Sequence, residues 1–514
     1  MLATALSATL VGLDAHLVRV EVEAARGVPS FELVGLAEAA VRESRVRVKS
    51  ALAQIGVDLS EYRIVVNLGP ADVKKTGSAF DVAIAAATLA ALGRVPAKAL
   101  EGTLFLGELS LTGAVHPVRG VLPRLLGLRA LGIVHAVVPE GNGAEAALVV
   151  GVRSGTVATI GDLKDALRGD YELPEPVACA PEVSPHGPDL EDVRGQATAR
   201  RALEVAAAGG HNLLMIGPPG AGKTMLARRL PGILPALAPR EALEVTAIQS
   251  ISGLLGGTRG LVPSRPFRAP HHTVSEVGLV GGGDAPRPGE VSLAHHGVLF
   301  LDELAEFKRG ALEALRQPLE DGVVTISRAQ AKATFPARPL VVAAMNPCAC
   351  GYRGDGTSRC ACTAERVLAY RARLSGPLLD RLDIHVVLPP VSVSSLQSGP
   401  PGETTAAVRE RVERARGVQE ARRHAGETTA GTNALLSSRD AEQVAPLCEA
   451  GARLITRAVE RLSLSARAYA KLIRVSRTIA DLDGSGAIGP HHVAEAISYR
   501  VLDRTSLAVA VSAA

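Results

Sequence analysis

Two kinds of hydrophobic pattern follow one another along the chain. Up to about residue 390, short apolar runs suited to buried strands alternate with alanine-rich stretches suited to helices. In the first part, the strand-like runs are residues 17–22, 63–68 and 136–139, and the helical ones are residues 44–55 and 79–92. Later segments are helical in pattern alone, at residues 406–424, 438–459 and 466–482. The pattern predicts two α/β units followed by a helical one.

Two stretches rich in proline and polar residues separate these blocks. They are residues 171–188 and 391–402, and their composition is typical of linkers. A chain of 514 residues is also too long for a single hydrophobic core. We therefore predict an α/β domain at residues 1–168, a linker at 169–188, a second α/β domain at 189–390 and a helical domain at 403–514.

The second α/β domain contains a complete phosphate-binding loop, G-x-x-x-x-G-K-[ST], between an apolar run at residues 211–216 and a helical segment that starts at Met225. Backbone N–H groups of such a loop, and the N-terminus of its helix, bind phosphate oxygens. We predict that Lys223 contacts the β- and γ-phosphates of ATP and that Thr224 binds Mg²⁺. A chance glycine-rich turn is the alternative, and the full match in this context argues against it. The predicted nucleotide-binding residues of the loop are Gly217, Pro218, Pro219, Gly220, Ala221, Gly222, Lys223 and Thr224.

An acidic pair follows an apolar run further along the chain. Residues 298–301 suit a strand buried on both faces, and Asp302 and Glu303 come directly after it. In open α/β sheets, ligands bind at the carboxyl ends of the strands. We predict that Asp302 binds Mg²⁺ through water and that Glu303 is the general base for the attacking water. Taken alone, the pair fits an ordinary strand before an acidic helix turn equally well.

Four of the six cysteines are concentrated in one short glycine-rich segment as two C-x-C pairs. Four thiolates can bind one tetrahedral Zn²⁺, and we predict a structural zinc site here. The spacing differs from the usual C-x₂-C, and four reduced cysteines without metal are the alternative. Two histidine pairs, at residues 271–272 and 295–296, are interpreted as packing beside the nucleotide site. The predicted zinc ligands are Cys348, Cys350, Cys360 and Cys362.

The composition mainly excludes certain classes of protein and certain modes of nucleic-acid binding. Hydrophobic residues make up 47% and charged residues 21%, as in a globular chain rather than a disordered one. No apolar stretch reaches the roughly 18 residues of a membrane span, and the first residues lack the basic region of a signal peptide, so we predict a cytoplasmic protein. Tryptophan is absent and the net charge is only +4. Nucleic acid would therefore be bound through Arg and Lys at its phosphates, not by base stacking.

A β-hairpin is predicted at residues 320–335. Residues 323–328 form a strand-like segment after Glu320-Asp321-Gly322, and a second strand-like segment follows at residues 332–335. The tip carries two cations and no acid, Arg328 and Lys332, which we predict to contact DNA. A solvated hairpin with ordinary surface charges is the alternative.

The order of several further motifs resembles that of the Mg-chelatase-like AAA+ ATPases and, over nearly the whole chain, the ComM/YifB family. These motifs are DVRGQ at residues 192–196, FRAPHHT at 267–273, RPGEVSLAH at 287–295, NPC at 346–348 and SGPLLDRLD at 375–383. The resemblance implies an AAA+ P-loop NTPase core and a hexameric ATPase. Members of the family that act in competence are thought to drive branch migration in DNA recombination.

The resemblance also implies roles for single residues. Asn346 resembles the sensor-1 residue, which orients the attacking water beside the γ-phosphate. Arg381 resembles the arginine finger, which reaches the ATP of a neighbouring subunit. Arg467 resembles the sensor-2 arginine of a C-terminal helical lid. In related ring ATPases, the hairpin that carries Arg328 and Lys332 here points into the central channel.

The first domain resembles the Lon-protease fold, an S5-domain-2-like α/β unit. Ser78 falls where that family has its nucleophilic serine. A serine nucleophile needs a base, and we place Leu122 at the position of the family's lysine. Because leucine cannot accept a proton, we predict that Ser78 is structural and that the domain is not a peptidase.

Three classes of function remain open: a DNA motor, a Mg-chelatase-type ATPase subunit, and an ATPase that threads protein, either as a protease or as a protein-remodelling ATPase without DNA activity. The missing base argues against a protease, and the first domain and the cysteine cluster argue against a chelatase motor. We therefore predict an ATPase that acts as a branch-migration helicase on incoming DNA during natural transformation. Its predicted partners are other copies in a homo-hexamer and DNA, branched or single-stranded and bound without sequence preference, and no membrane.

Overall fold

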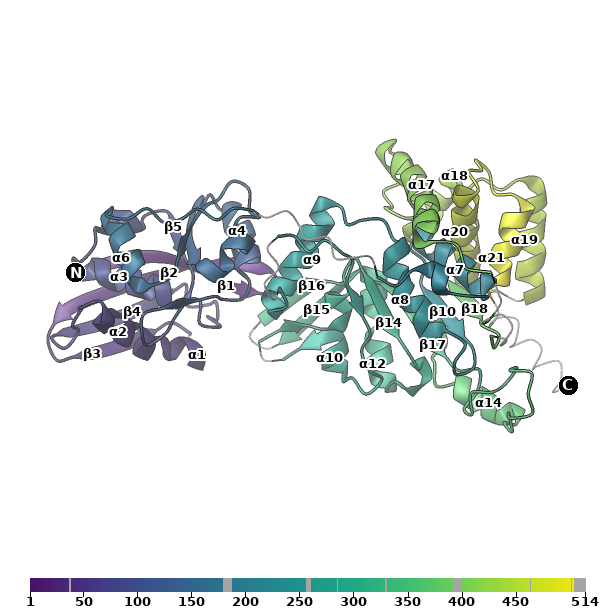
Figure 1. Cartoon of the computed structure of the whole chain (residues 1–514), viewed down its shortest axis with the longest axis horizontal. Coiled ribbons are helices and arrows are strands. Elements are labelled where there is room, and N and C mark those ends of the chain that lie inside the picture. Colours follow the sequence, from purple (N-terminus) through teal and green to yellow (C-terminus); the bar gives the residue numbers. More distant parts are fainter. Residues whose placement is uncertain are drawn as a thin grey trace.

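The structure is a computed structural model that describes residues 1–36, 38–178, 187–255, 260–283, 285–328, 331–391, 397, 400–462, 464–500 and 502. Figure 1 shows three parts in chain order along the longest axis of the molecule: a first α/β unit, a second sheet with its helices, and a group of helices near the C-terminus. In the described residues, no helix combines the length and the apolar character needed to cross a membrane.

The first unit is built on a seven-stranded mixed sheet with the order β3-β4-β2-β1-β5-β8-β9. The pairs β1–β2 and β2–β4 are antiparallel, and the other neighbours are parallel. Its helix α3 (Asp81–Ala91) is buried along its whole length, which explains why the sequence there is almost entirely small and apolar. The strands are β1 (Leu2–Val11), β2 (Asp14–Arg26), β3 (Ser30–Val34), β4 (Tyr62–Gly69), β5 (Thr103–Phe105), β8 (His135–Pro139) and β9 (Arg153–Val157).

Short elements complete this unit. The other helices are α1 (Ala39–Arg42), α2 (Ser44–Gln54), α4 (Val121–Arg129), α5 (Gly143–Ala146) and α6 (Ile160–Arg168). A small two-stranded sheet joins β6 (Glu108–Leu109) to β7 (Val115–His116). Each predicted strand and helix of this part overlaps an observed element of the same type.

The second sheet has five strands in the order β11-β14-β17-β10-β18, and all of its pairs are parallel. Every residue of β10, β14 and β17 is buried. Alternate residues of β10 pack into two different cores, Leu213 and Met215 on one face and Leu214 and Ile216 on the other. Burial on both faces explains the uninterrupted apolar runs. The strands are β10 (Leu213–Ile216), β11 (Phe267–Arg268), β14 (Val298–Leu301), β17 (Leu340–Met345) and β18 (Ile384–Val387).

Helices and hairpins surround this sheet. The longer helices are α7 (Ala197–Gly209), α8 (Lys223–Ile233), α9 (Pro239–Ser252) and α14 (Ala364–Arg371), and the shorter ones are α10 (Glu276–Val280), α11 (Glu290–Leu293), α12 (Arg309–Ala314), α13 (Arg316–Asp321) and α15 (Gly376–Leu379). The predicted hairpin is confirmed as β15 (Val323–Arg328) and β16 (Ala331–Pro336), and a shorter one joins β12 (Gly281–Gly282) to β13 (Arg287–Pro288).

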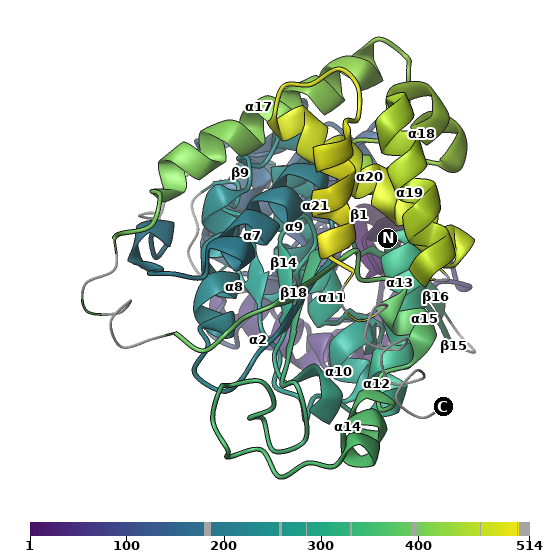
Figure 2. The same ribbon diagram turned by 90° about the vertical axis from the view of Figure 1, so that its right-hand side faces the viewer.

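The last part is helical, as predicted, but one predicted segment is wrong. Residues 438–459 form two helices, α18 (Ser438–Val444) and α19 (Glu449–Leu462), not one. Pro446 lies between them, and proline lacks the N–H that a continuing helix needs and clashes with the preceding turn. The other helices are α17 (Thr405–His424), α20 (Ala466–Leu482) and α21 (Pro490–Ser498), and Figure 2 shows them gathered on one side of the sheet.

The first unit contacts the second sheet's helices directly. In Figure 1, α4 and β1 lie beside α9 and the β15–β16 hairpin. Ala247 of α9 is buried in the same apolar cluster as Val121 and Leu125 of α4. At the interface, the hydroxyl of Ser250 donates to the buried carboxylate of Glu145. The contact therefore combines apolar packing with a buried hydrogen bond.

Candidate nucleotide-binding site

The phosphate-binding loop connects the carboxyl end of β10 to the start of α8. Gly222 caps the helix with φ 88°, a left-handed conformation that favours glycine. α8 then begins at Lys223, so the free N–H groups of its first turn face the loop. This is the geometry in which a strand–loop–helix unit binds phosphate.

Lys223 connects this loop to the neighbouring strand β17. Its Nζ donates to the carbonyl oxygens of Gly217 and Pro218 at 2.6 and 3.1 Å and to Oδ1 of Asn346 at 3.1 Å. Burial lowers the pKa of Lys223, while the carboxylates of Asp302 and Glu303 oppose that shift. The ammonium group is therefore held at the junction of the loop, Asn346 and two carboxylates.

Thr224 and Asp302 meet at the mouth of the same site. The Thr224 hydroxyl donates to Oδ2 of Asp302 at 2.8 Å, although the two residues come from different strand–helix connections. A hydroxyl and a carboxylate are oxygen ligands of the type that Mg²⁺ binds beside nucleotide phosphates. The two side chains fit the predicted metal site.

Glu303 lies next to a histidine for which the sequence indicates only a packing role. His272 Nδ1 is 3.1 Å from a carboxylate oxygen of Glu303, and the carboxylate is about half exposed. Glu303 also has φ 52°, a strained conformation for a residue other than glycine and one that is frequent at functional sites. The only signal for His272 in the sequence is its place in the FRAPHHT motif, because its contact with Glu303 depends on the fold.

A cavity of about 330 Å³ brings these residues together. This volume lies at the lower end of the range for small-molecule sites, about 300–1,000 Å³. The predicted residues of the loop, the acidic pair and Asn346 all line it, apart from Gly217 and Pro218, whose carbonyls bond to Lys223. The lining residues are Pro219, Gly220, Ala221, Gly222, Lys223, Thr224, Met225, Asp302, Glu303, Met345 and Asn346.

Two predicted arginines are not among those lining residues. Arg381 forms an ion pair with Glu320, and its backbone carbonyl accepts a hydrogen bond from the Asn212 side chain at 3.0 Å. Arg467 is exposed in the first turn of α20. The side chain of Arg381 is only 14% exposed, whereas Arg467 is open to solvent, and the roles of both arginines stay predictions.

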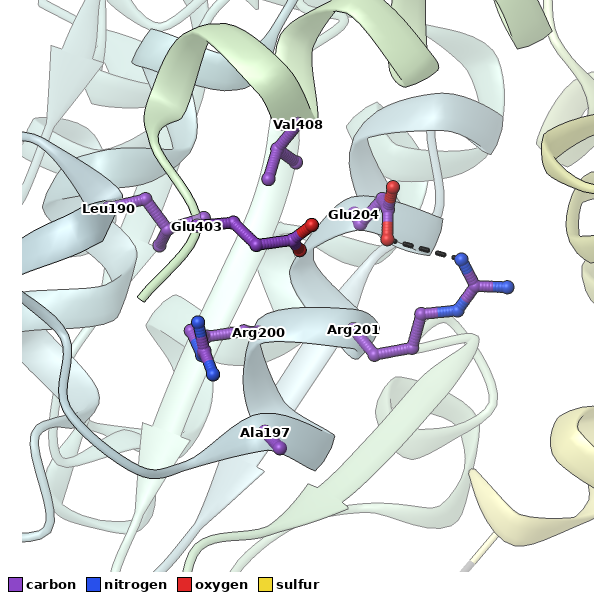
Figure 3. Close-up of a pocket in the computed structure, with 7 residues that line it drawn as sticks. All are labelled: Leu190, Ala197, Arg200, Arg201, Glu204, Glu403 and Val408. Carbon is purple, nitrogen blue, oxygen red and sulfur yellow. Dashed lines mark hydrogen bonds and ion pairs between the residues drawn. The ribbon is translucent and has the colours of Figure 1, made fainter. Parts of the chain in front are cut away.

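A second cavity, of about 160 Å³, lies between α7 and the segment that leads into α17. Figure 3 shows its arginine and glutamate side chains, with Arg201 bonded to Glu204 at 3.1 Å. Arg411 pairs with both Glu204 and Glu403. Because its carboxylates are occupied by ion pairs, we interpret this cavity as structural.

The four clustered cysteines converge, as their spacing predicts. Cys348 Sγ is 3.3 Å from Cys350 Sγ and 3.8 Å from Cys360 Sγ, and the last two sulfur atoms are 3.6 Å apart. With Cys362, all four sulfur atoms lie within 4.8 Å of one another. The cluster follows Asn346 directly, at the edge of the nucleotide site.

The pair His295-His296 forms a hydrogen-bonded cluster with Glu244 of α9. Nε2 of each ring lies 3.0–3.1 Å from the same carboxylate oxygen. Nδ1 of His295 accepts the backbone N–H of Arg338 at 3.1 Å. Its Nε2 must then carry the proton of the neutral ring, and it donates to Glu244 instead of binding a metal. This arrangement fits the packing interpretation.

The remaining predicted residues lie away from the cavity. Lys332 is exposed on β16, whereas the hairpin tip at residues 329–330 and the side chain of Arg328 lie outside the described residues. In the first unit, the Ser78 hydroxyl bonds to the carboxylate of Glu108, and Leu122 is fully buried.

Comparison with known families agrees with the geometry along almost the whole chain. Residues 189–396 match the family described as magnesium chelatase, subunit ChlI. Residues 20–142 match a family described as subunit ChlI of Mg-chelatase, and residues 402–500 match the C-terminal family of the same subunit. The phosphate-binding loop, the acidic pair and the cysteine cluster all fall in the first of these matches.

Full-length relatives give the same assignment. Competence protein ComM of Haemophilus influenzae is 44% identical over 98% of both chains. The uncharacterized protein YifB of Escherichia coli is 43% identical over 96% of both chains. An uncharacterized protein of Mycobacterium tuberculosis is 45% identical over 97% of this chain and 98% of its own. This chain therefore belongs to the ComM/YifB family of Mg-chelatase-like AAA+ ATPases.

Proposed function

We propose that this chain is an ATP-hydrolysing ring motor that acts on DNA, as a branch-migration helicase in the recombination of DNA taken up during natural transformation. The observation that carries the ATPase part is the cavity in which Lys223, Thr224, Asp302, Glu303 and Asn346 meet. The similarity to a relative named competence protein supports the DNA part. The action of this chain on DNA thus rests on similarity more than on geometry.

In this proposal, each residue of the cavity has one task. Lys223 and the loop N–H groups bind the β- and γ-phosphates, and Thr224 and Asp302 hold Mg²⁺, which would neutralise phosphate charge. Glu303 accepts a proton from the attacking water, and Asn346 orients that water. His272 positions the Glu303 carboxylate through the 3.1 Å contact.

We further propose that the active sites are completed between subunits of a homo-hexamer. Arg381 acts in trans as the arginine finger, and Arg467 acts from the helical lid at residues 403–514. The pairing of Arg381 with Glu320 holds it outside the cavity of its own subunit. The first unit, residues 1–168, is a Lon-protease-like fold without peptidase activity, joined to the ATPase core by a linker at residues 169–188, and the protein works in the cytoplasm.

In this proposal, the β15–β16 hairpin binds DNA. Lys332 is exposed on β16. Arg328 is the last residue of the paired strand β15, where it lies opposite Ala331. In a hexamer, these cations would form a ring of positive charge around the phosphate backbone. Binding of this kind is independent of sequence and falls steeply with salt.

A DNA-stimulated ATPase assay tests the proposal. Steady-state ATP hydrolysis should rise on adding single-stranded or four-way-junction DNA, and a labelled junction should be converted to its products only with hydrolysable ATP. Glu303→Gln controls for a contaminating ATPase. A rate of ATP hydrolysis that none of these DNAs changes would favour the other two candidates, a chelatase-type subunit or a protein-remodelling ATPase.

The hairpin has its own test with a matched control. Replacing both Arg328 and Lys332 with Ala should leave basal hydrolysis intact and abolish its stimulation by DNA, and the salt slope of binding should fall by about one for each phosphate that is no longer neutralised. The control replaces Arg457 and Arg461, exposed cations of α19, with Ala. Junction migration at the wild-type rate in the hairpin variant would show that residues other than Arg328 and Lys332 bind the DNA.

A further inference from the structure

The cysteine loop, residues 346–363, leaves β17 at the nucleotide site and returns at the start of α14. Its four cysteines are the only described His, Cys, Asp or Glu side chains that gather into a group of four able to hold one ion. Within the loop, Gly351, Gly354 and Gly356 all have left-handed backbone conformations, and no helix or strand forms. The middle of the loop is held by hydrogen bonds from Thr357 and Arg359 to the carboxylate of Asp355, and the two cysteine pairs lie on either side of it.

The sulfur positions match a tetrahedral metal centre. Zn–S bonds of about 2.3 Å place tetrahedral ligands about 3.8 Å apart. The sulfur–sulfur distances of 3.3, 3.6 and 3.8 Å among Cys348, Cys350 and Cys360 are close to that value. They are far above the roughly 2 Å of a disulfide. One centre shared by four sulfurs explains this packing, whereas pairwise disulfides do not.

A cation lies beside the cluster. The guanidinium of Arg371 interacts electrostatically with Cys348 and adds positive charge beside the cluster. Four thiolates in a tetrahedron select Zn²⁺ over hard cations such as Mg²⁺.

The loop also touches the nucleotide site. A Cβ added to Gly351 would lie 3.1 Å from Cδ of Pro219 in the phosphate-binding loop and 3.9 Å from Cγ of Asn346. Asn346 in turn accepts the hydrogen bond of Lys223 at 3.1 Å. The turn that follows the first two cysteines thus lies against two residues that line the ATP cavity.

We propose that Cys348, Cys350, Cys360 and Cys362 bind one structural Zn²⁺, and that this zinc site holds Pro219 and Asn346 in place, so that loss of zinc weakens nucleotide binding. The second half rests on the proposed ATP binding; the first half does not. Zinc here takes no part in hydrolysis. It fixes the loop whose contact with Pro219 and Asn346 shapes the cavity.

Metal content of the full-length protein tests the first half. Purified protein should contain about one Zn per chain by elemental analysis, and Cys360→Ser combined with Cys362→Ser should contain none. Cys448→Ser is the matched control, because Cys448 lies apart, just before α19, and it should keep its zinc. Folded wild-type protein without zinc or another bound metal would overturn the site.

Nucleotide affinity tests the second half. The Kd of a fluorescent ATP analogue should rise about tenfold in the double serine variant, within the range usual for coupled sites. If that variant does not fold, zinc is instead released from wild-type protein with a mercurial reagent and a chelator, and then added back after thiol reduction. Affinity should fall and return. An unchanged Kd in zinc-free folded protein would overturn the coupling, whereas zinc-loaded protein that binds no nucleotide would overturn the proposed function and leave the metal site standing.

Discussion

Ser78 in the first unit and Lys223 in the second occupy similar local positions. Each follows a glycine with a left-handed backbone, Gly77 at φ 78° and Gly222 at φ 88°, and each lies at or just before the start of a helix that packs on a sheet. Their surroundings differ. Ser78 bonds to Glu108, while Lys223 lies in a cavity of about 330 Å³ with several other polar side chains.

A helix start that follows a left-handed glycine therefore does not form a functional site by itself. Near Ser78, polar groups satisfy one another: Asp81 is buried and bonded to Arg47 and Ser44. Around Lys223, polar groups from three strand ends face one open space, so they can bind a ligand. Polar side chains that converge on a shared cavity can bind a ligand, whereas polar side chains that bond only to one another stabilise the fold. The local turn is the same in both cases.

The largest effect should come from Lys223→Ala. The variant loses the ammonium that the loop presents to phosphate, so nucleotide binding should weaken by about 100-fold and hydrolysis should disappear. Isothermal titration with ATP and Mg²⁺ measures the first, and phosphate release measures the second. Hydrolysis at the wild-type rate would show that the cavity around Lys223 is not the active site.

A second large loss is expected for Arg381→Ala. Hydrolysis should fall by about 10³-fold, the lower end for arginine fingers, while ATP binding stays intact. Mixing this variant with Lys223→Ala should restore part of the activity through interfaces that combine an intact cavity with an intact Arg381. Failure to recover, in mixed oligomers verified by native mass spectrometry, would show that Arg381 does not act between subunits.

Glu303→Gln should lower turnover by about 10²-fold, since general bases contribute about 10²–10⁴-fold. The glutamine keeps the size of the side chain, so ATP should still bind, and the complex should persist. Quenched-flow hydrolysis and a nucleotide-binding assay separate the two effects. Turnover like that of the wild type would remove Glu303 as the base.

The smallest effect is expected in the first unit. Ser78→Ala removes the partner of Glu108 and should lower the free energy of unfolding by about 1 kcal/mol, with ATP turnover unchanged. Chemical denaturation and the phosphate-release assay measure the two. Peptidase activity in the wild type that Ser78→Ala abolishes would reverse the interpretation of this unit.

The sequence predicts those parts of the second sheet that depend on neighbours in the chain. The pattern places strand β14 at its observed bounds because both of its faces are buried, and it places the loop at Lys223 because phosphate binding demands fixed spacing. The cysteine cluster is predictable for the same reason, since its ligands lie close together along the chain.

What the sequence does not predict depends on distant contacts or on a single residue inside a periodic pattern. His272 meets Glu303 only after two strands have paired side by side. Pro446 interrupts a periodic pattern that continues on both sides of it, so the pattern predicts one helix where the structure has two. The bond of Ser250 to Glu145 joins residues 105 positions apart, and no spacing rule indicates it.

Helix α9 is attached at two points that face different partners. Ser250 is bonded to Glu145 of the first unit, and Glu244 is bonded to His295, in the turn that leads into β14. Each residue added to or removed from a helix rotates everything beyond it by about 100°. An insertion or deletion between Glu244 and Ser250 would therefore break one attachment whenever it preserved the other. We therefore expect this stretch of α9 to tolerate substitutions but not changes in length. Its length sets the spacing between the first unit and the strand that leads to Asp302.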